Sequence, residues 1–161
     1  MSAASRKRIR RTRGTRRASS GSSTAASALA SRLATALGAL ARNLPNPADE
    51  STDYFRPFVA SMPATVRLDG DTFHRALKIG ARYRIDLSSA DQLLSSAGDP
   101  DNWGDEVAAG FRLLENVMRA TLSEVSVAFA RATGVVRVRM WLFGRSENGT
   151  LVGLRSTSTE T

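Results

Sequence analysis

Eight cationic side chains lie between Arg6 and Arg17, and no acidic residue accompanies them. Seven of the eight are arginines, whose planar guanidinium can bind two phosphate oxygens at once. A dense block of like charges with almost nothing apolar to bury does not fold on itself and needs a polyanion. The segment therefore predicts a disordered arm that binds nucleic-acid phosphates without reading bases; a nuclear-import signal and a solubilising tail are the alternatives. The arm cations are Arg6, Lys7, Arg8, Arg10, Arg11, Arg13, Arg16 and Arg17.

This arm carries the whole net charge of the chain. The sequence has 23 Lys and Arg against 15 Asp and Glu, a formal charge of +8. Without the eight arm cations, basic and acidic residues are equal in number. The rest of the chain is therefore expected to have a weak long-range field, whatever its local patches do.

Two Arg-x-Arg pairs form a second candidate site, because each occupies a stretch of alternating polarity. Side chains two apart on a strand share a face. Neighbouring strands would thus combine four guanidiniums with Trp141 and Phe143 into a platform for single-stranded nucleic acid. The alternative is a solvated face paired to acids such as Asp86, with Trp141 covered by another element. The pairs are Arg82 with Arg84, and Arg137 with Arg139.

No residue pattern points to catalysis, a cofactor or a metal. The absence of cysteine excludes disulfides, thiolate zinc sites and cysteine nucleophiles. His74 is the only histidine and no nucleophile motif accompanies it, so a surface or strand-packed histidine is expected. The acidic segment 99–106 resembles a calcium loop, but Trp103 and Gly110 stand where oxygen ligands are needed, which favours a helix start. We expect no enzyme, no cofactor and no membrane span.

The composition divides the chain into four parts. Residues 1–24 are predicted to be the disordered arm and a Ser/Gly linker. Residues 25–44 are predicted to form an amphipathic helix, ended by Pro45. Residues 45–155 are predicted to be a single folded domain, and residues 156–161 a flexible tail. The helix has one narrow apolar stripe, which either lies on the domain or pairs with another copy of itself: Leu29, Leu33, Leu37, Leu40 and Leu44.

Within the domain, alternation and turn residues predict strands in the first and last thirds and helices between them. Residues 49–63 are interpreted as an irregular apolar strap. The segment 121–132 fits either a helix or a strand; we favour a strand that begins near Leu122 and continues through Thr133-Gly134 into a second strand ending near Phe143. The other predicted strands are 65–68, 73–79, 81–87 and 151–154, and the predicted helices are 88–96 and 105–118.

The order of an Arg-rich arm, a Ser/Ala linker, a leucine helix and a small strand-rich domain resembles coat proteins of small positive-strand RNA plant viruses. The arm is similar to that of cucumovirus coat proteins, and the length to that of satellite-virus coat proteins. Residues 119–129 followed by 134–138 are similar to a jelly-roll hairpin of such proteins. Residues 64–73, with a helical interpretation of 111–134, resemble rod-shaped tobamovirus coat proteins, which lack such an arm.

The resemblance implies a mainly β fold, a reduced jelly-roll-like sandwich with one or two helices; an α+β domain or a helical bundle of the rod-virus type are the alternatives. It implies a capsid protein that packages single-stranded RNA through the arm, forms a homo-oligomer through the domain, and resides in the virion and the host cytoplasm or nucleus. The alternative function is a non-structural RNA-binding protein, such as a silencing suppressor or a nucleic-acid chaperone.

Overall fold

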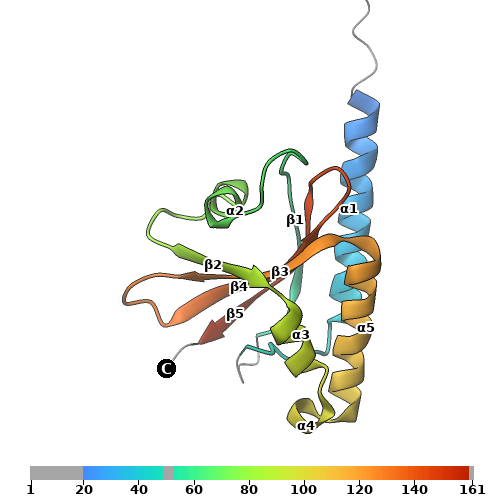
Figure 1. Cartoon of the computed structure of the whole chain (residues 1–161), viewed down its shortest axis with the longest axis vertical. Coiled ribbons are helices and arrows are strands. Elements are labelled where there is room, and N and C mark those ends of the chain that lie inside the picture. The colour runs from blue at the N-terminus through green and yellow to red at the C-terminus, as the bar shows by residue number, and fades with distance from the viewer. Residues whose placement is uncertain (1–19, 49–52, 160–161) are drawn as a thin grey trace, which may run out of the picture.

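A computed structural model describes residues 20–48 and 53–159, so the eight arm cations lie outside the described residues. The described chain forms one five-stranded antiparallel sheet with strand order β1-β5-β4-β3-β2 and helices on both faces (Figure 1). The helices are α1 (Ser20–Leu40), α2 (Gly70–Ala76), α3 (Asp91–Ala97), α4 (Pro100–Trp103) and α5 (Asp105–Thr121). The strands are β1 (Arg56–Ala60), β2 (Arg84–Ser89), β3 (Ser123–Arg131), β4 (Arg137–Arg145) and β5 (Leu151–Thr159).

This arrangement is a mixed α+β fold. A jelly-roll-like sandwich needs two sheets packed face to face, and the described residues form a single sheet whose faces are covered by helices. The helical-bundle alternative is wrong, because the sheet is the centre of the domain. Among the described residues, no helix has the length and apolar content to cross a bilayer.

Helix α1 lies on the domain, as one of the two sequence alternatives proposed, but with shifted ends. It begins at Ser20, so part of the predicted linker is helical, and it ends at Leu40. After Leu40 the chain continues in turns, in which the N–H groups of Arg42 and Leu44 donate to the carbonyls three residues before them. Leu29 is 65% exposed, but the other four leucines of the predicted stripe lie on the buried side: Leu37 and Leu44 are buried, and Leu33 and Leu40 pack against the core. Ala30 and Ala34 complete the buried face of the helix, and Ala41 and Leu44 continue the contact beyond its end.

Helix α2 replaces a predicted strand at residues 73–79. Asp69, interpreted as a turn residue, is the N-cap: its carboxylate accepts the backbone N–H of Thr72 at 2.8 Å, and the Thr72 hydroxyl accepts the N–H of Asp69 at 2.9 Å. This capping box satisfies two backbone donors that the first turn would otherwise leave free. Phe73 then packs edge-on against Trp141, with ring centroids 5.5 Å apart. The local cap therefore outweighs the alternating pattern.

The predicted hairpin near Leu122 to Phe143 is confirmed as strands β3 and β4. Helices α3 and α5 occupy their predicted segments within a few residues, and Asp99 caps α4 within the acidic segment. Strand β5 is longer than predicted and lies between β1 and β4, so Ser156–Thr159 belongs to the sheet and is not a flexible tail. Strand β1 forms inside the predicted strap because its backbone pairs with β5.

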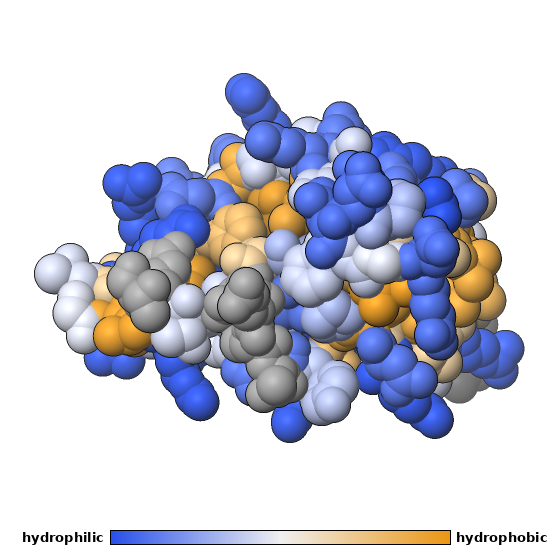
Figure 2. All heavy atoms as spheres, turned by 90° about the horizontal axis from the view of Figure 1, so that it is seen from below, coloured by the Kyte–Doolittle hydropathy of each residue, from blue (hydrophilic) through white to orange (hydrophobic). Residues whose placement is uncertain are grey.

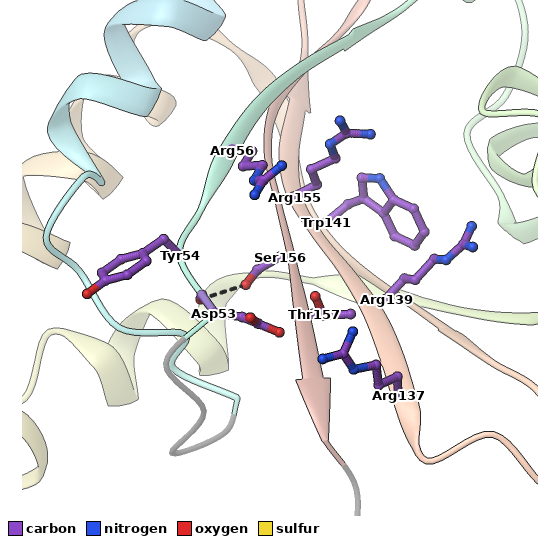
Figure 3. A pocket seen from close by; sticks show the side chains of 9 residues that line it. All are labelled: Asp53, Tyr54, Arg56, Arg137, Arg139, Trp141, Arg155, Ser156 and Thr157. Atoms are coloured by element: carbon purple, nitrogen blue, oxygen red, sulfur yellow. Dashed lines mark hydrogen bonds between the residues drawn. The ribbon is translucent and has the colours of Figure 1, made fainter.

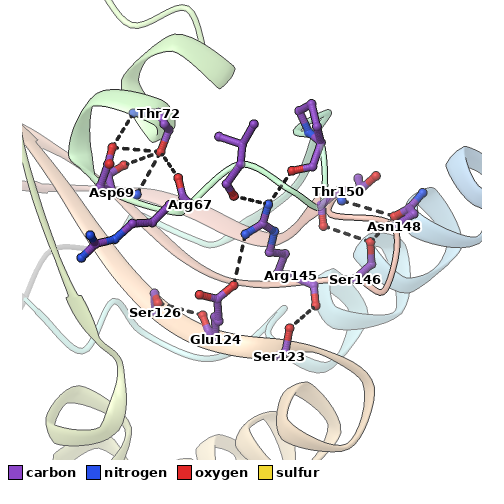
Figure 4. A network of polar contacts seen from close by, with 12 residues as sticks. Arg67, Asp69, Thr72, Ser123, Glu124, Ser126, Arg145, Ser146, Asn148 and Thr150 are labelled. Carbon is purple, nitrogen blue, oxygen red and sulfur yellow. Dashed lines mark hydrogen bonds and ion pairs between the residues drawn. The ribbon is translucent and has the colours of Figure 1, made fainter.

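Arg145, at the end of β4, ties the segment between β1 and α2 to the sheet (Figure 4). One guanidinium nitrogen, Nη2, donates to the carbonyls of Pro63 and Val66, each at 2.6 Å. The other, Nη1, lies 3.3 Å from a carboxylate oxygen of Glu124. The Arg145 side chain is only 8% exposed. These contacts hold the segment that leads into α2, and α2 in turn covers Trp141.

Candidate nucleic-acid interface

The strand register places four arginines on one face of the sheet. Arg137, Arg139 and Trp141 alternate along β4, so their side chains share that face. Trp141 is paired with Arg155 on β5, and Arg155 is paired with Arg56 on the edge strand β1. Helix α2 covers the other part of this face through Phe73, which contacts Trp141 and Phe143. The uncovered part is therefore lined by arginines from three adjacent strands.

These side chains line a hollow of about 620 Å³, which we call the arginine hollow (Figure 3). All four guanidinium-bearing residues are exposed, whereas Trp141 is 5% exposed and forms part of the floor. Among the described residues of the lining, Asp53 is the only acid, and its backbone carbonyl accepts a hydrogen bond from the Ser156 hydroxyl at 3.0 Å. The lining residues are Asp53, Tyr54, Arg56, Arg137, Arg139, Trp141, Arg155, Ser156 and Thr157.

The four arginines form no ion pair with any acid in the described ranges 20–48 and 53–159. Arg139 stacks over the ring of Tyr83, with its guanidinium carbon 4.9 Å from the ring centroid. This contact holds the side chain without neutralising its charge. Four positive charges gathered with no ion pair to a described acid repel one another, and a bound polyanion would remove that repulsion. The charge of the hollow therefore suits an anion.

The predicted platform of two Arg-x-Arg pairs is wrong in its composition. Arg139 of β4 pairs with Ala130 of β3, and Ala130 pairs with Ile85 of β2, so these three side chains share a face. Arg84, the residue before Ile85, therefore points to the opposite face. There Arg84 forms an ion pair with Asp86 at 2.9 Å, as the alternative interpretation proposed. Arg82 lies outside β2 and packs over the Tyr83 ring at 5.1 Å.

The two aromatic side chains of that platform are covered as well. Trp141 is buried under Phe73, and Phe143 is fully buried. Arg137 and Arg139 do share a face, but their partners are Arg56 and Arg155. Neither Arg56 nor Arg155 was predicted from the sequence to lie at this site. Arg56 is in the segment interpreted as an irregular strap, and Arg155 follows directly after the predicted strand 151–154. The alternation of Arg155, Thr157 and Thr159 was a signal that a longer strand continued.

The ion pairs on the opposite face predict a small acid sensitivity of folding. Hydrogen bonding from Arg84, and then from Arg131 at 2.8 Å, holds the pKa of Asp86 below its ordinary value. A lowered folded pKa stabilises the protein above the unfolded pKa of about 3.9, and this contribution is lost as pH falls through the folded pKa. Asp86→Asn is expected to lower the free energy of unfolding at pH 7 by less than about 1 kcal/mol, because the carboxylate is 34% exposed. Urea unfolding at pH 7 and pH 2.5 checks this; a difference that does not shrink in acid would contradict it.

Other candidate chemistry is absent from the described part of the chain. No group of three or more His, Cys, Asp or Glu side chains there could hold a metal ion. His74 is partly buried on α2, and its Nε2 lies 3.2 Å from the carbonyl of Gly80, which is a local structural contact. The arginine hollow is therefore the site that the geometry singles out.

Comparison with known proteins assigns no family to this chain. No protein-family model matches the sequence. A search of curated proteins likewise found no significant match. The function must therefore be argued from the charges and geometry of the side chains themselves.

Proposed function

We propose that this protein binds single-stranded RNA through its phosphates, using the N-terminal arm and the arginine hollow together. The observation that carries the proposal is the set of four guanidiniums on one sheet face that form no ion pair with a described acid: Arg56, Arg137, Arg139 and Arg155. The arm supplies charge for capture, and the hollow supplies fixed positions for bound phosphates. Neither part presents an arrangement that reads a base sequence.

The preference for arginine supports phosphate as the ligand group. All four cations of the hollow are arginines, as are seven of the eight in the arm. A guanidinium can donate two parallel hydrogen bonds to one phosphate, whereas an ammonium acts as a point charge. Tyr54, which is 66% exposed at the edge of the hollow, offers a ring on which an unpaired base can stack. Unpaired bases are available in single strands, which favours this substrate over duplexes.

The coat-protein function adds self-assembly to this binding. On the face shown in Figure 2, apolar residues form separate patches bounded by polar side chains. The exposed large apolar residues are scattered over several elements, which is ordinary for a protein surface. RNA binding is therefore the better supported half of the proposal. Negative-stain microscopy of the protein with RNA separates the two: particles or rods support a coat protein, and small oligomers support the non-structural alternative.

The test of the arginine hollow is the double substitution Arg139→Gln with Arg155→Gln. Loss of two phosphate contacts is expected to make the slope of log affinity against log salt shallower by about 1.4 for a single strand. The matched control is Arg32→Gln with Arg112→Gln, which removes the same charge from exposed positions on α1 and α5. Fluorescence anisotropy of a labelled oligouridine across a salt series measures both. Equal losses in the two variants would contradict a defined site.

A second readout separates the hollow from the arm. The chain has two tryptophans, and Trp103 lies on α4 outside the hollow. In a Trp103→Phe background, oligouridine is expected to change the emission of Trp141, which lines the hollow. Asp53→Asn removes the acid that the described lining contains and is expected to strengthen binding several-fold, by an electrostatic contribution of up to about 1 kcal/mol. Unchanged Trp141 emission at saturating RNA would show that the arm binds alone.

A further inference from the structure

A second hollow of about 600 Å³ adjoins the arginine hollow on the same face of the sheet. One wall is strand β1 with the residue after it, Phe58 to Ser61, and the other is the end of α2 with the residues after it, Arg75 to Lys78. Trp141 and Arg155 line both hollows. The two spaces therefore border each other at these side chains, and together we call them the sheet groove.

The second hollow has the same charge character as the first. Its described lining contains the cations Arg75, Lys78 and Arg155 and no acid from residues 20–48 or 53–159. Arg75 and Lys78 are exposed, and neither forms an ion pair with the described acids. Lys78 has a left-handed backbone, with φ of 51°, where the chain turns after α2. In the part of the chain that the structure describes, the groove as a whole is thus lined by six cations and one acid.

The strand register sets the length of the groove. Arg56, Arg155 and Trp141 lie at one level of the sheet. On β4, Arg137 lies four positions before Trp141, and Arg145 lies four positions after it. Arg145 is level with Ala60 of the second hollow, because both pair with Leu151 of β5. Eight residues at about 3.3 Å each give roughly 26 Å. At about 3.4 Å per stacked nucleotide, that length holds about eight nucleotides, and fewer when the strand is extended.

We propose that the sheet groove binds a continuous run of unpaired nucleotides, with Arg75 and Lys78 contacting phosphates beyond those held in the arginine hollow. This inference rests on the proposed function and names its substrate as a single strand long enough to pass Trp141. The end of α2 forms a wall opposite β1, so the ligand lies between two elements. A single backbone fits between such walls, whereas a duplex would contact only their rims.

The test uses the full-length chain with Arg75→Gln and Lys78→Asn; asparagine tolerates the left-handed backbone at position 78. Two oligouridines are titrated in the Trp103→Phe background. One has about 3 nucleotides and the other about 10, which are lengths below and within the range that single-strand grooves occupy. Trp141 emission reports binding in the groove. The longer strand is expected to lose on the order of tenfold in affinity, with a salt slope shallower by about 1.4. The trinucleotide, which fits the arginine hollow alone, is expected to lose less than twofold.

The Arg32→Gln, Arg112→Gln variant is again the charge-matched control. Equal losses for short and long strands, or no loss beyond the control, would overturn the inference. The inference would also be overturned if a duplex of the same length bound the natural chain as tightly as the single strand and lost as much affinity in the variant. Failure of the proposed function would give a different result. The Arg139→Gln, Arg155→Gln variant would then lose no more affinity than the control for either strand length. Loss confined to that variant would leave the proposed function standing and remove the extended groove.

Discussion

Replacing the eight arm cations between Arg6 and Arg17 with glutamine is expected to make the salt dependence of RNA binding much shallower. If about six of them meet phosphates, the slope of log affinity against log salt changes by about 4 for a single strand, which is the largest binding effect expected for this protein. The rest of the chain has equal numbers of acids and bases. The remaining slope should be the smaller one that the arginine hollow supplies.

The control is a chain with residues 6–17 in reversed order. It keeps every charge, and phosphate contacts that read no base sequence do not depend on residue order, so its slope should equal that of the natural chain. Anisotropy with a labelled oligouridine across a salt series gives both slopes. A glutamine variant that retains the natural slope would remove the arm from the binding site.

Arg145→Met is expected to destabilise the domain by about 2–4 kcal/mol. The substitution keeps much of the apolar stem but removes the hydrogen bonds from a charged donor to the carbonyls of Pro63 and Val66, each expected to contribute about 1–2 kcal/mol. Urea unfolding measures the change. Because the segment 61–68 leads into α2, loosening it should also raise the exposure of Trp141, which a red shift of its emission in the Trp103→Phe background would report.

Three variants identify which Arg145 contact matters. Arg145→Lys keeps the charge but has no fork to span two carbonyls, so it should lose somewhat less than methionine. Glu124→Gln removes only the ion pair with a carboxylate that is 52% exposed, and should cost below about 1 kcal/mol. Arg112→Met, at an exposed position on α5, should stay within about 0.5 kcal/mol. Equal effects of Glu124→Gln and Arg145→Met would place the stability in the ion pair and contradict the role of the carbonyls.

Elements with a strong local signal were predicted well. Helix α5 has apolar residues at helical spacing and acids in its first turn, and it forms where expected. The β3–β4 hairpin was correctly chosen over a helix at the one segment that fitted both, because β-branched and aromatic residues alternate there. In both elements, the local pattern and the tertiary burial agree.

Elements that depend on distant partners were missed. Strand β1 has no clear alternation and is a strand because its backbone pairs with β5. The end of β5 is polar, and it continues as a strand through pairing with the first half of β4. Helix α2 was predicted as a strand for a different reason. Its local signal is the Asp69–Thr72 cap, but the apparent alternation of polar and apolar residues was given more weight.

The sequence by itself determined the charge of the arm and the fact that Arg137 and Arg139 share a face, because both follow from residue type and local spacing. The tertiary structure alone decided which residues join them. Arg155 and Arg56 come from distant parts of the chain and reach the hollow through strand register. Arg84, although it also lies on a strand with period two, is turned away because β2 is aligned with Ile85 on that face. Pairing register is a long-range property, set by which side chains the core buries, and a one-residue shift would exchange the two faces.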